Sequence, residues 1–151
     1  MAKVILNKDY GGFGVSALAH QMYAKKKFGR ELFIYSGGDF SEGLRAVHYT
    51  KVSVDDFNKR HSLMYFYSFT DLGQEINLNL SLDDNIETLN ITSDYREDPL
   101  LIEIVEELGE KANDSFSTLK VVEIPDELAN GNYMIDNYDG IEILHAKVDI
   151  Y

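Results

Sequence analysis

The sequence predicts an α+β fold (mixed α/β), in which a single-domain mixed sheet has two main amphipathic helices packed on it. Apolar segments of strand length stand before, between and after two segments with helical periodicity. The 151 residues match the size of one domain, and no linker rich in proline, glycine or serine divides them. We therefore expect residues 1–151 to form one domain whose helices cover at least one face of the sheet.

The first segment predicts the order strand, loop, helix, strand. "KVIL" (Lys3–Leu6) has the pattern of a short buried strand, and "ELFIYS" (Glu31–Ser36) has that of a second. Between them, a one-sided apolar stripe predicts a helix that ends at Gly29, after three lysines that suit the negative end of its dipole. The stripe consists of Val15, Leu18, Ala19, Met22 and Tyr23. This order is consistent with a parallel strand pair joined by a right-handed crossover.

The central segment predicts aromatic strands, a short helix and an alternating strand. "RAVHYTKVSV" (Arg45–Val54) and "SLMYFYSF" (Ser62–Phe69) have strand composition, and "SVDD" can cap a helix over Val54–Arg60. In "INLNLSL" (Ile76–Leu82) apolar and polar residues alternate strictly, which is typical of a half-buried antiparallel strand. Residues 83–92 are expected to turn and pair with it as a hairpin.

The last third predicts a second amphipathic helix and a closing hairpin. Asp98 is a natural N-cap, and Pro99 occupies the first helical turn, where its missing N–H is not needed. "LKVVEIPD" (Leu119–Asp126) predicts a buried strand, and residues 132–150 predict a hairpin about the turn Tyr138-Asp139-Gly140. The helix has Leu101, Ile104, Val105, Leu108 and Ala112 on its apolar side and Glu103, Glu106, Glu107 and Glu110 on its outer side.

Charge is distributed unevenly along the chain. The formal net charge is −12; residues 1–81 hold 10 basic and 8 acidic residues, whereas residues 82–151 hold 4 basic and 18 acidic residues. Duplex binding needs a continuous basic footprint, so we expect no direct nucleic-acid binding. The acidic half fits a basic protein partner or a solvated surface.

Composition excludes several further classes of protein. The absence of cysteine excludes disulfides, thiol redox chemistry and cysteine-ligated zinc. The apolar run near the N-terminus is too short for a signal-peptide core or a membrane span. We therefore expect a cytoplasmic protein that is not associated with a membrane.

The glycine-rich loop "NKDYGGFGVS" (Asn7–Ser16) is the main candidate site, with two interpretations open. As an anion site it uses the backbone N–H groups at a helix start, which glycines allow a ligand to approach closely. The residues of that site are Lys8 for charge, Gly11, Gly12, Gly14 and Ser16 for the anion, and Tyr10 or Phe13 for stacking on a base. As a structural turn, it has Phe13 as a core anchor and Ser16 as an N-cap. The loop matches neither the P-loop nor the dinucleotide pattern, so an NTP hydrolase is not expected.

Three arginines are further candidates for phosphate contacts: Arg30, Arg45 and Arg96. For Arg96 a local ion pair with Asp94 or Glu97 is the alternative. The four histidines lack metal-ligand spacing, no G-x-S-x-G elbow is present, and the paired acids suit turns and helix faces. We therefore expect no enzymatic activity, no metal and no cofactor.

The segment "LMYFYSF" (Leu63–Phe69) makes the centre of the chain unusually aromatic. Core packing accounts for most of these rings, but alternate residues of a strand face opposite sides. An outward Tyr65 or Tyr67 would suit an interface, so a homodimer is one alternative.

Four blocks of the chain, kept in order, resemble a family of small phage and prophage proteins for which no activity is established. The blocks are "NKDYGGFGVS" (Asn7–Ser16), "REDPLLIEIVEELGEKAN" (Arg96–Asn113), "LKVVEIPD" (Leu119–Asp126) and "YDGIE" (Tyr138–Glu142). Residues from about 37 to 93 carry no such match and form a possible family-variable insertion.

The resemblance implies a phage accessory protein that acts in the bacterial host cytoplasm, where such proteins commonly inhibit host defence. Our first hypothesis is a non-catalytic protein that sequesters a small nucleotide signal at the glycine loop. The alternative is an acidic protein–protein inhibitor that blocks a host defence or DNA-binding protein through Glu103, Glu106, Glu107 and Glu110. A structural or virion accessory protein is the second alternative.

Overall fold

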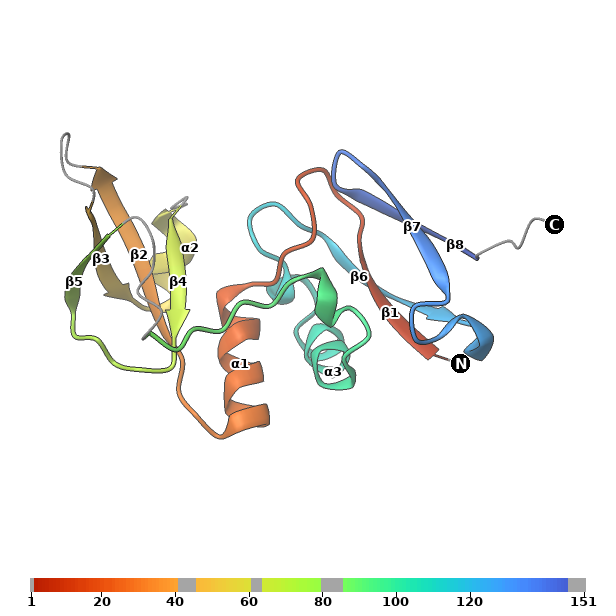
Figure 1. Cartoon of the computed structure of the whole chain (residues 1–151), viewed down its shortest axis with the longest axis horizontal. Helices are drawn as coiled ribbons and strands as arrows, with labels where there is room; N and C mark the ends of the chain where they lie inside the picture. Colours follow the sequence, from red (N-terminus) through yellow and green to blue (C-terminus); the bar gives the residue numbers. More distant parts are fainter. Residues whose placement is uncertain (1, 41–45, 61–63, 80–85, 147–151) are drawn as a thin grey trace. The chain divides into compact units, whose positions relative to one another are not determined.

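The predicted α+β class is confirmed by helices and antiparallel strand pairs that form two compact units (Figure 1). The structure is a computed structural model that describes residues 2–40, 46–60, 64–79 and 86–146. Unit 1 comprises residues 1–19 and 91–151, and unit 2 comprises residues 20–90. The possible insertion predicted at about residues 37–93 therefore falls largely within unit 2.

Unit 1 is built on two antiparallel strand pairs with a shared core. Strand β1 (Ala2–Asn7) pairs with β6 (Leu119–Ile124). Strand β7 (Tyr133–Tyr138) pairs with β8 (Ile141–Ala146) in the closing hairpin that the sequence predicts. Apolar side chains from both pairs meet in one cluster, which includes Val4, Leu6, Ile124, Tyr133, Ile135 and Leu144. The expectation of a parallel pair at the start of the chain is wrong, because β1 pairs with β6 and not with the next strand.

Helix α3 (Pro99–Leu108) is the amphipathic helix of unit 1. The Asp98 carboxylate caps it by accepting hydrogen bonds from the backbone N–H groups of Leu100 and Leu101, at 2.8 and 3.2 Å. The helix contacts β1 and β6 and buries Leu101, Ile102, Ile104 and Val105. Each fully buried side chain of this size contributes about 1.5–3 kcal/mol, so the apolar stripe fixes which face of the helix points outward. The following turn, η2 (Gly109–Ala112), continues the outer face.

Helix α1 (Ala17–Phe28) begins where the sequence predicts an N-cap. The Ser16 hydroxyl accepts from the backbone N–H of Ala19 at 3.1 Å and donates to the Lys111 carbonyl at 2.6 Å. The three basic residues of the last turn, Lys25, Lys26 and Lys27, occupy the end at which the helix dipole favours positive charge.

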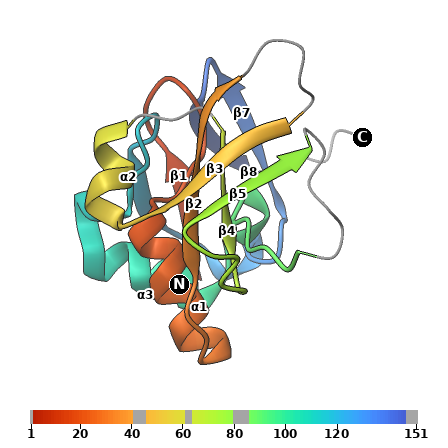
Figure 2. The ribbon, with the colours of Figure 1, turned by 90° about the vertical axis from the view of Figure 1, so that its left-hand side faces the viewer.

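Unit 2 contains a four-stranded antiparallel sheet of order β4-β2-β3-β5 (Figure 2). Its strands are β2 (Phe33–Phe40), β3 (Ala46–Val52), β4 (Tyr65–Ser68) and β5 (Glu75–Asn79). On one face, Tyr35 stacks on Phe66 with ring centroids 5.1 Å apart, and Tyr49 meets the same ring edge-on at 4.9 Å. On the other face, Phe57 of α2 (Val54–Arg60) packs against Tyr65 and Tyr67.

The central predictions are confirmed in part. Tyr65 is 44% exposed whereas Tyr67 is buried, so one of the two tyrosines proposed for an interface faces solvent. Residues 80–85, which include the predicted turn, lie outside the described residues. Beyond them, Thr88 forms a bridge with Ser68 of β4, so this part of the predicted hairpin is adjacent to β4 rather than β5.

Candidate functional site

The glycine-rich loop lies against two other loops of unit 1. The backbone N–H of Gly11 donates to the Asp139 carbonyl at 3.1 Å, so the loop lies beside the β7–β8 turn (Figure 1). A Cβ atom on Gly11 would lie 2.7 Å from the Phe116 carbonyl oxygen. A Cβ atom on Gly140 would collide with the backbone nitrogens of Gly11 and Gly12. Close packing therefore accounts for the glycines at positions 11 and 140, whereas Gly12 is explained by its positive φ of 109°.

The predicted residues of the anion site are held by other parts of unit 1. Lys8 donates through Nζ to the Glu142 carbonyl at 2.7 Å, and the Gly14 carbonyl accepts from the Ser117 hydroxyl at 2.7 Å. Phe13 lies under the Arg96 guanidinium, 5.2 Å from its carbon to the ring centroid. Tyr10 is the loop's exposed aromatic side chain, with 64% of its surface exposed. The geometry favours the structural turn, and Ser16 is the N-cap that this interpretation predicts.

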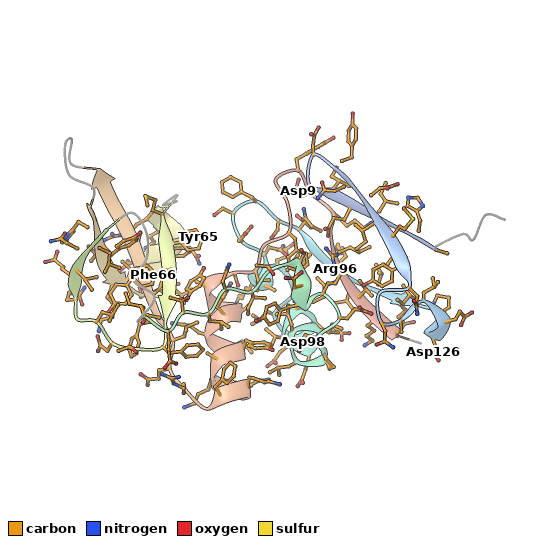
Figure 3. The ribbon with its side chains drawn as sticks, viewed as in Figure 1. Asp9, Tyr65, Phe66, Arg96, Asp98 and Asp126 are labelled. Carbon is orange, nitrogen blue, oxygen red and sulfur yellow. The ribbon has the colours of Figure 1, made fainter. Side chains whose placement is uncertain are left out.

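Arg96, which is labelled in Figure 3, forms a buried ion pair with Glu142. Its Nη2 atom lies 2.8 Å from Oε2 of Glu142, and its Nη1 atom donates to Oε1 of the same carboxylate at 3.1 Å. The two side chains are 13% and 4% exposed. Nη1 also donates to the Ile5 carbonyl at 3.0 Å, which ties the pair to β1. The prediction that Arg96 pairs locally with Asp94 or Glu97 is wrong, because the paired carboxylate comes from β8.

Asn7 joins this pair to the glycine loop. Its backbone N–H donates to Oε1 of Glu142 at 2.8 Å, and its side-chain amide donates to the carbonyls of Asp9 and Gly140 at 2.8 and 2.7 Å. Its Oδ1 atom accepts from the backbone N–H of Thr118 at 2.9 Å. Sequence analysis missed both Asn7 and Glu142 as site residues. The available signal was the position of each polar residue, since Asn7 directly follows the apolar segment "KVIL" and Glu142 lies within the apolar segment "IEIL".

The other two candidate arginines are not part of this site. Arg30 belongs to unit 2, where its Nη1 lies 2.7 Å from Oε2 of Glu87 and its guanidinium carbon lies 4.6 Å from the centre of the Phe69 ring. Arg45 lies outside the described residues.

Unit 1 has a second candidate site, a pocket of about 630 Å³ beside α3. The apolar lining includes residues of α3 and of β1, and the acidic lining consists of three glutamates. The lining residues are Ala2, Lys3, Glu97, Pro99, Ile102, Glu103, Glu106, Ala129 and Asn130. Lys3 pairs with Glu106 at 3.0 Å, so the lining keeps a net negative charge.

Glu97 is held in place at this pocket. Its Oε1 atom accepts from the backbone N–H of Asn130 at 2.9 Å. Burial, followed by the charge of the neighbouring Glu97 carboxylate, raises the pKa of Tyr133 to about 12. The phenol therefore stays protonated at neutral pH, and it shares a hydrogen bond with Glu97.

The negative charge of the protein is concentrated in unit 1. This unit holds 16 acidic and 6 basic residues, a formal charge of −10, whereas unit 2 holds 10 and 8, a formal charge of −2. The predicted partner surface is exposed on the outer side of α3 and η2; its residues are Glu103, Glu106, Glu107 and Glu110, which we call the acidic face. The acidic face adjoins the pocket through Glu103 and Glu106.

Across residues 2–40, 46–60, 64–79 and 86–146, no group of three or more histidine or acidic side chains could hold a metal ion. In the same part of the chain, no helix is both long and apolar enough to cross a membrane.

Comparisons with protein-family models, with curated proteins and with solved structures find no match to this chain.

We expect Gly140→Ala to destabilise the protein more than Gly131→Ala. Both glycines have positive φ, 101° and 80°, but only a Cβ on Gly140 meets backbone atoms. Backbone strain alone costs about 1–2 kcal/mol, and the collision adds to it, so we expect a loss of about 3 kcal/mol for Gly140→Ala. Urea unfolding of the full chain measures both losses. Equal losses would show that the glycine loop and the β7–β8 turn are not in close contact.

We expect Arg96→Met to cost about 3–5 kcal/mol of unfolding free energy, because it leaves the buried Glu142 carboxylate without its countercharge. The matched control is Lys3→Met, which removes an exposed ion pair to Glu106 and should cost about 1 kcal/mol or less. The same urea experiment compares them. If the two substitutions cost the same, the Arg96–Glu142 pair does not hold unit 1 together.

Proposed function

We propose that this chain is a non-catalytic, phage-encoded inhibitor that blocks a basic host protein, such as a defence or DNA-binding protein, through its acidic face. The observation that carries the proposal is the concentration of charge in unit 1 and its position beside a pocket. Sixteen acidic residues lie in this unit, and two residues of the acidic face line the pocket.

The pocket has the composition that suits a lysine or arginine side chain. Ile102 and Pro99 provide apolar surface for the aliphatic stem, and Glu97 and Glu103 provide negative charge for the head group. Lys3 and Glu106, which pair at 3.0 Å, complete the charged lining. A basic residue of a partner would thus be held by packing and charge together.

The uneven charge also has a kinetic consequence for an inhibitor. A surface with one sign of charge attracts an oppositely charged partner over distances of about the Debye length, near 8–10 Å in physiological salt. Such steering raises the association rate, which suits a protein that must reach its target before the host responds. A DNA-binding protein offers a matching basic surface.

Nucleotide sequestration stays a prediction with less support from the geometry. The positive groups expected to meet phosphate have partners within the protein: Lys8 donates to a backbone carbonyl, Arg96 pairs with Glu142, and Arg30 pairs with Glu87. A nucleotide would have to displace these contacts. The exposed Tyr10 is the feature that still suits base stacking.

We expect the double substitution Glu103→Lys/Glu107→Lys to abolish partner binding, because it reverses charge on the acidic face beside the pocket. Immobilised full-length parent and variant proteins are used to capture proteins from bacterial lysate, and the captured partner is then followed kinetically. For the parent, the association rate should fall steeply between about 50 mM and about 200 mM salt.

The matched control is Asp55→Lys/Asp56→Lys, which makes the same change in net charge on the exposed surface of α2 in unit 2. This control should retain the partner. Loss of binding in both variants would mean that net charge matters rather than the acidic face, and retention in both would contradict the proposal.

A thermal-unfolding screen with mono-, di- and cyclic nucleotides tests the alternative. A nucleotide present at 100 times its dissociation constant adds about 2.7 kcal/mol, or roughly 5–10 °C in Tm for a chain of this size. If the acidic face is the functional surface, we expect no shift with any of them. A shift that disappears in Gly12→Val would favour the glycine loop as a nucleotide site.

A further inference from the structure

Three large aromatic side chains of unit 1 are exposed in adjacent loops. Tyr10, Phe116 and Tyr138 are 64%, 60% and 72% exposed. They come from three distant parts of the sequence, namely the glycine loop, the loop before β6 and the end of β7. Each of these side chains has more than half of its surface in solvent, so core packing does not account for them.

The three rings belong to loops that meet at Gly11. Tyr10 precedes Gly11 in the chain, and a Cβ on Gly11 would lie 2.9 Å from the Cβ of Phe116. The N–H of Gly11 donates to the carbonyl of Asp139, which follows Tyr138. Phe116 is thus in direct contact with Gly11, Tyr10 is its neighbour in the chain, and Tyr138 is one residue from its hydrogen-bond partner. We call Tyr10, Phe116 and Tyr138 the aromatic surface.

The backbone that carries the aromatic surface is held by local hydrogen bonds. The Asp9 carboxylate accepts from the N–H of Tyr10, and the Asp114 carboxylate accepts from the N–H of Phe116, both at 2.8 Å. In the β7–β8 turn, the N–H of Gly140 donates to the Asn137 side chain at 2.8 Å. A partner would therefore bind rings whose backbone is already ordered, which lowers the entropy cost of binding.

Charge around the aromatic surface favours a positively charged partner. Asp9 precedes Tyr10, Asp139 follows Tyr138, and Asp114 lies two residues before Phe116. The cation in the same loop, Lys8, donates to the Glu142 carbonyl. Aromatic faces flanked by carboxylates suit an arginine, whose planar guanidinium stacks on a ring and donates to a carboxylate at the same time. A nucleic acid is disfavoured because unit 1 carries a formal charge of −10.

We propose that the aromatic surface docks an arginine-bearing segment of a basic protein partner. The choice of a basic protein rests on the proposed function, but the surface is separate from the acidic face and its pocket. The pocket is lined by Ala2 and Lys3 at the start of β1, whereas the aromatic surface follows Asn7 at the end of the same strand. The two surfaces therefore lie near opposite ends of a strand about 17–20 Å long, which lets one partner contact both.

The test is a titration of the isotope-labelled full chain with a synthetic peptide of alternating glycine and arginine, followed by amide chemical shifts. We expect the largest shifts at residues 9–12, 115–117 and 138–140. The dissociation constant for the peptide should rise by about tenfold in the triple variant Tyr10→Ser/Phe116→Ser/Tyr138→Ser. It should rise by less in Tyr138→Ser alone. The same peptide with lysine in place of arginine should bind more weakly.

The matched control is Met134→Ser/Ile143→Ser, which removes two exposed apolar side chains from the same hairpin and should leave the affinity unchanged. Glu103→Lys/Glu107→Lys separates this proposal from the proposed function. If that variant still binds the peptide while the aromatic variants do not, the aromatic surface is supported whatever the acidic face does. If the aromatic variants bind as the parent does, or the parent does not bind the arginine peptide, the aromatic surface is overturned and the acidic face is tested separately by its own capture experiment.

Discussion

The buried ion pair between Arg96 and Glu142 is the interaction on which the arrangement of unit 1 depends. A charge in the interior is costly unless it is paired and hydrogen-bonded, so each partner fixes the other. Arg96 also donates to the Ile5 carbonyl of β1, and Glu142 accepts from the N–H of Asn7 at the end of the same strand. The pair thereby joins β1, β8 and the segment that leads into α3, and it brings the glycine loop against the β7–β8 turn.

Local signals in the sequence predicted the helices well. Asp98 and Pro99 marked the start of α3, Ser16 marked the start of α1, and "SVDD" predicted the extent of α2, because a cap and an apolar stripe act within one or two turns of chain. The partner of β1 was not predictable in this way. Ala2 pairs with Ile124, and nothing in a short window of sequence indicates which distant strand completes the sheet.

The site was predictable only where its chemistry is local. The glycine loop stood out, but the neighbours that exclude a side chain at Gly11 and Gly14 are Phe116 and Asp114, which are far away in the chain. Arg96 was recognised as unusual, whereas its carboxylate partner lies 46 residues away and its burial depends on the complete fold. Tyr10 was identified as a stacking residue. Phe116 and Tyr138 were not, because only the folded structure shows that their loops meet the glycine loop.

The two units differ in how their residues are distributed along the chain. Unit 2 is one continuous segment, residues 20–90, whereas unit 1 combines residues 1–19 with residues 91–151. During synthesis, unit 2 can therefore assemble as soon as its own residues have left the ribosome. Strand β1 cannot pair at that stage, because its partner β6 ends only at Ile124. Until Ile124 has been synthesised, Val4, Ile5 and Leu6 lie in an apolar segment whose strand partner is missing, and such an unpaired segment is open to non-native pairing.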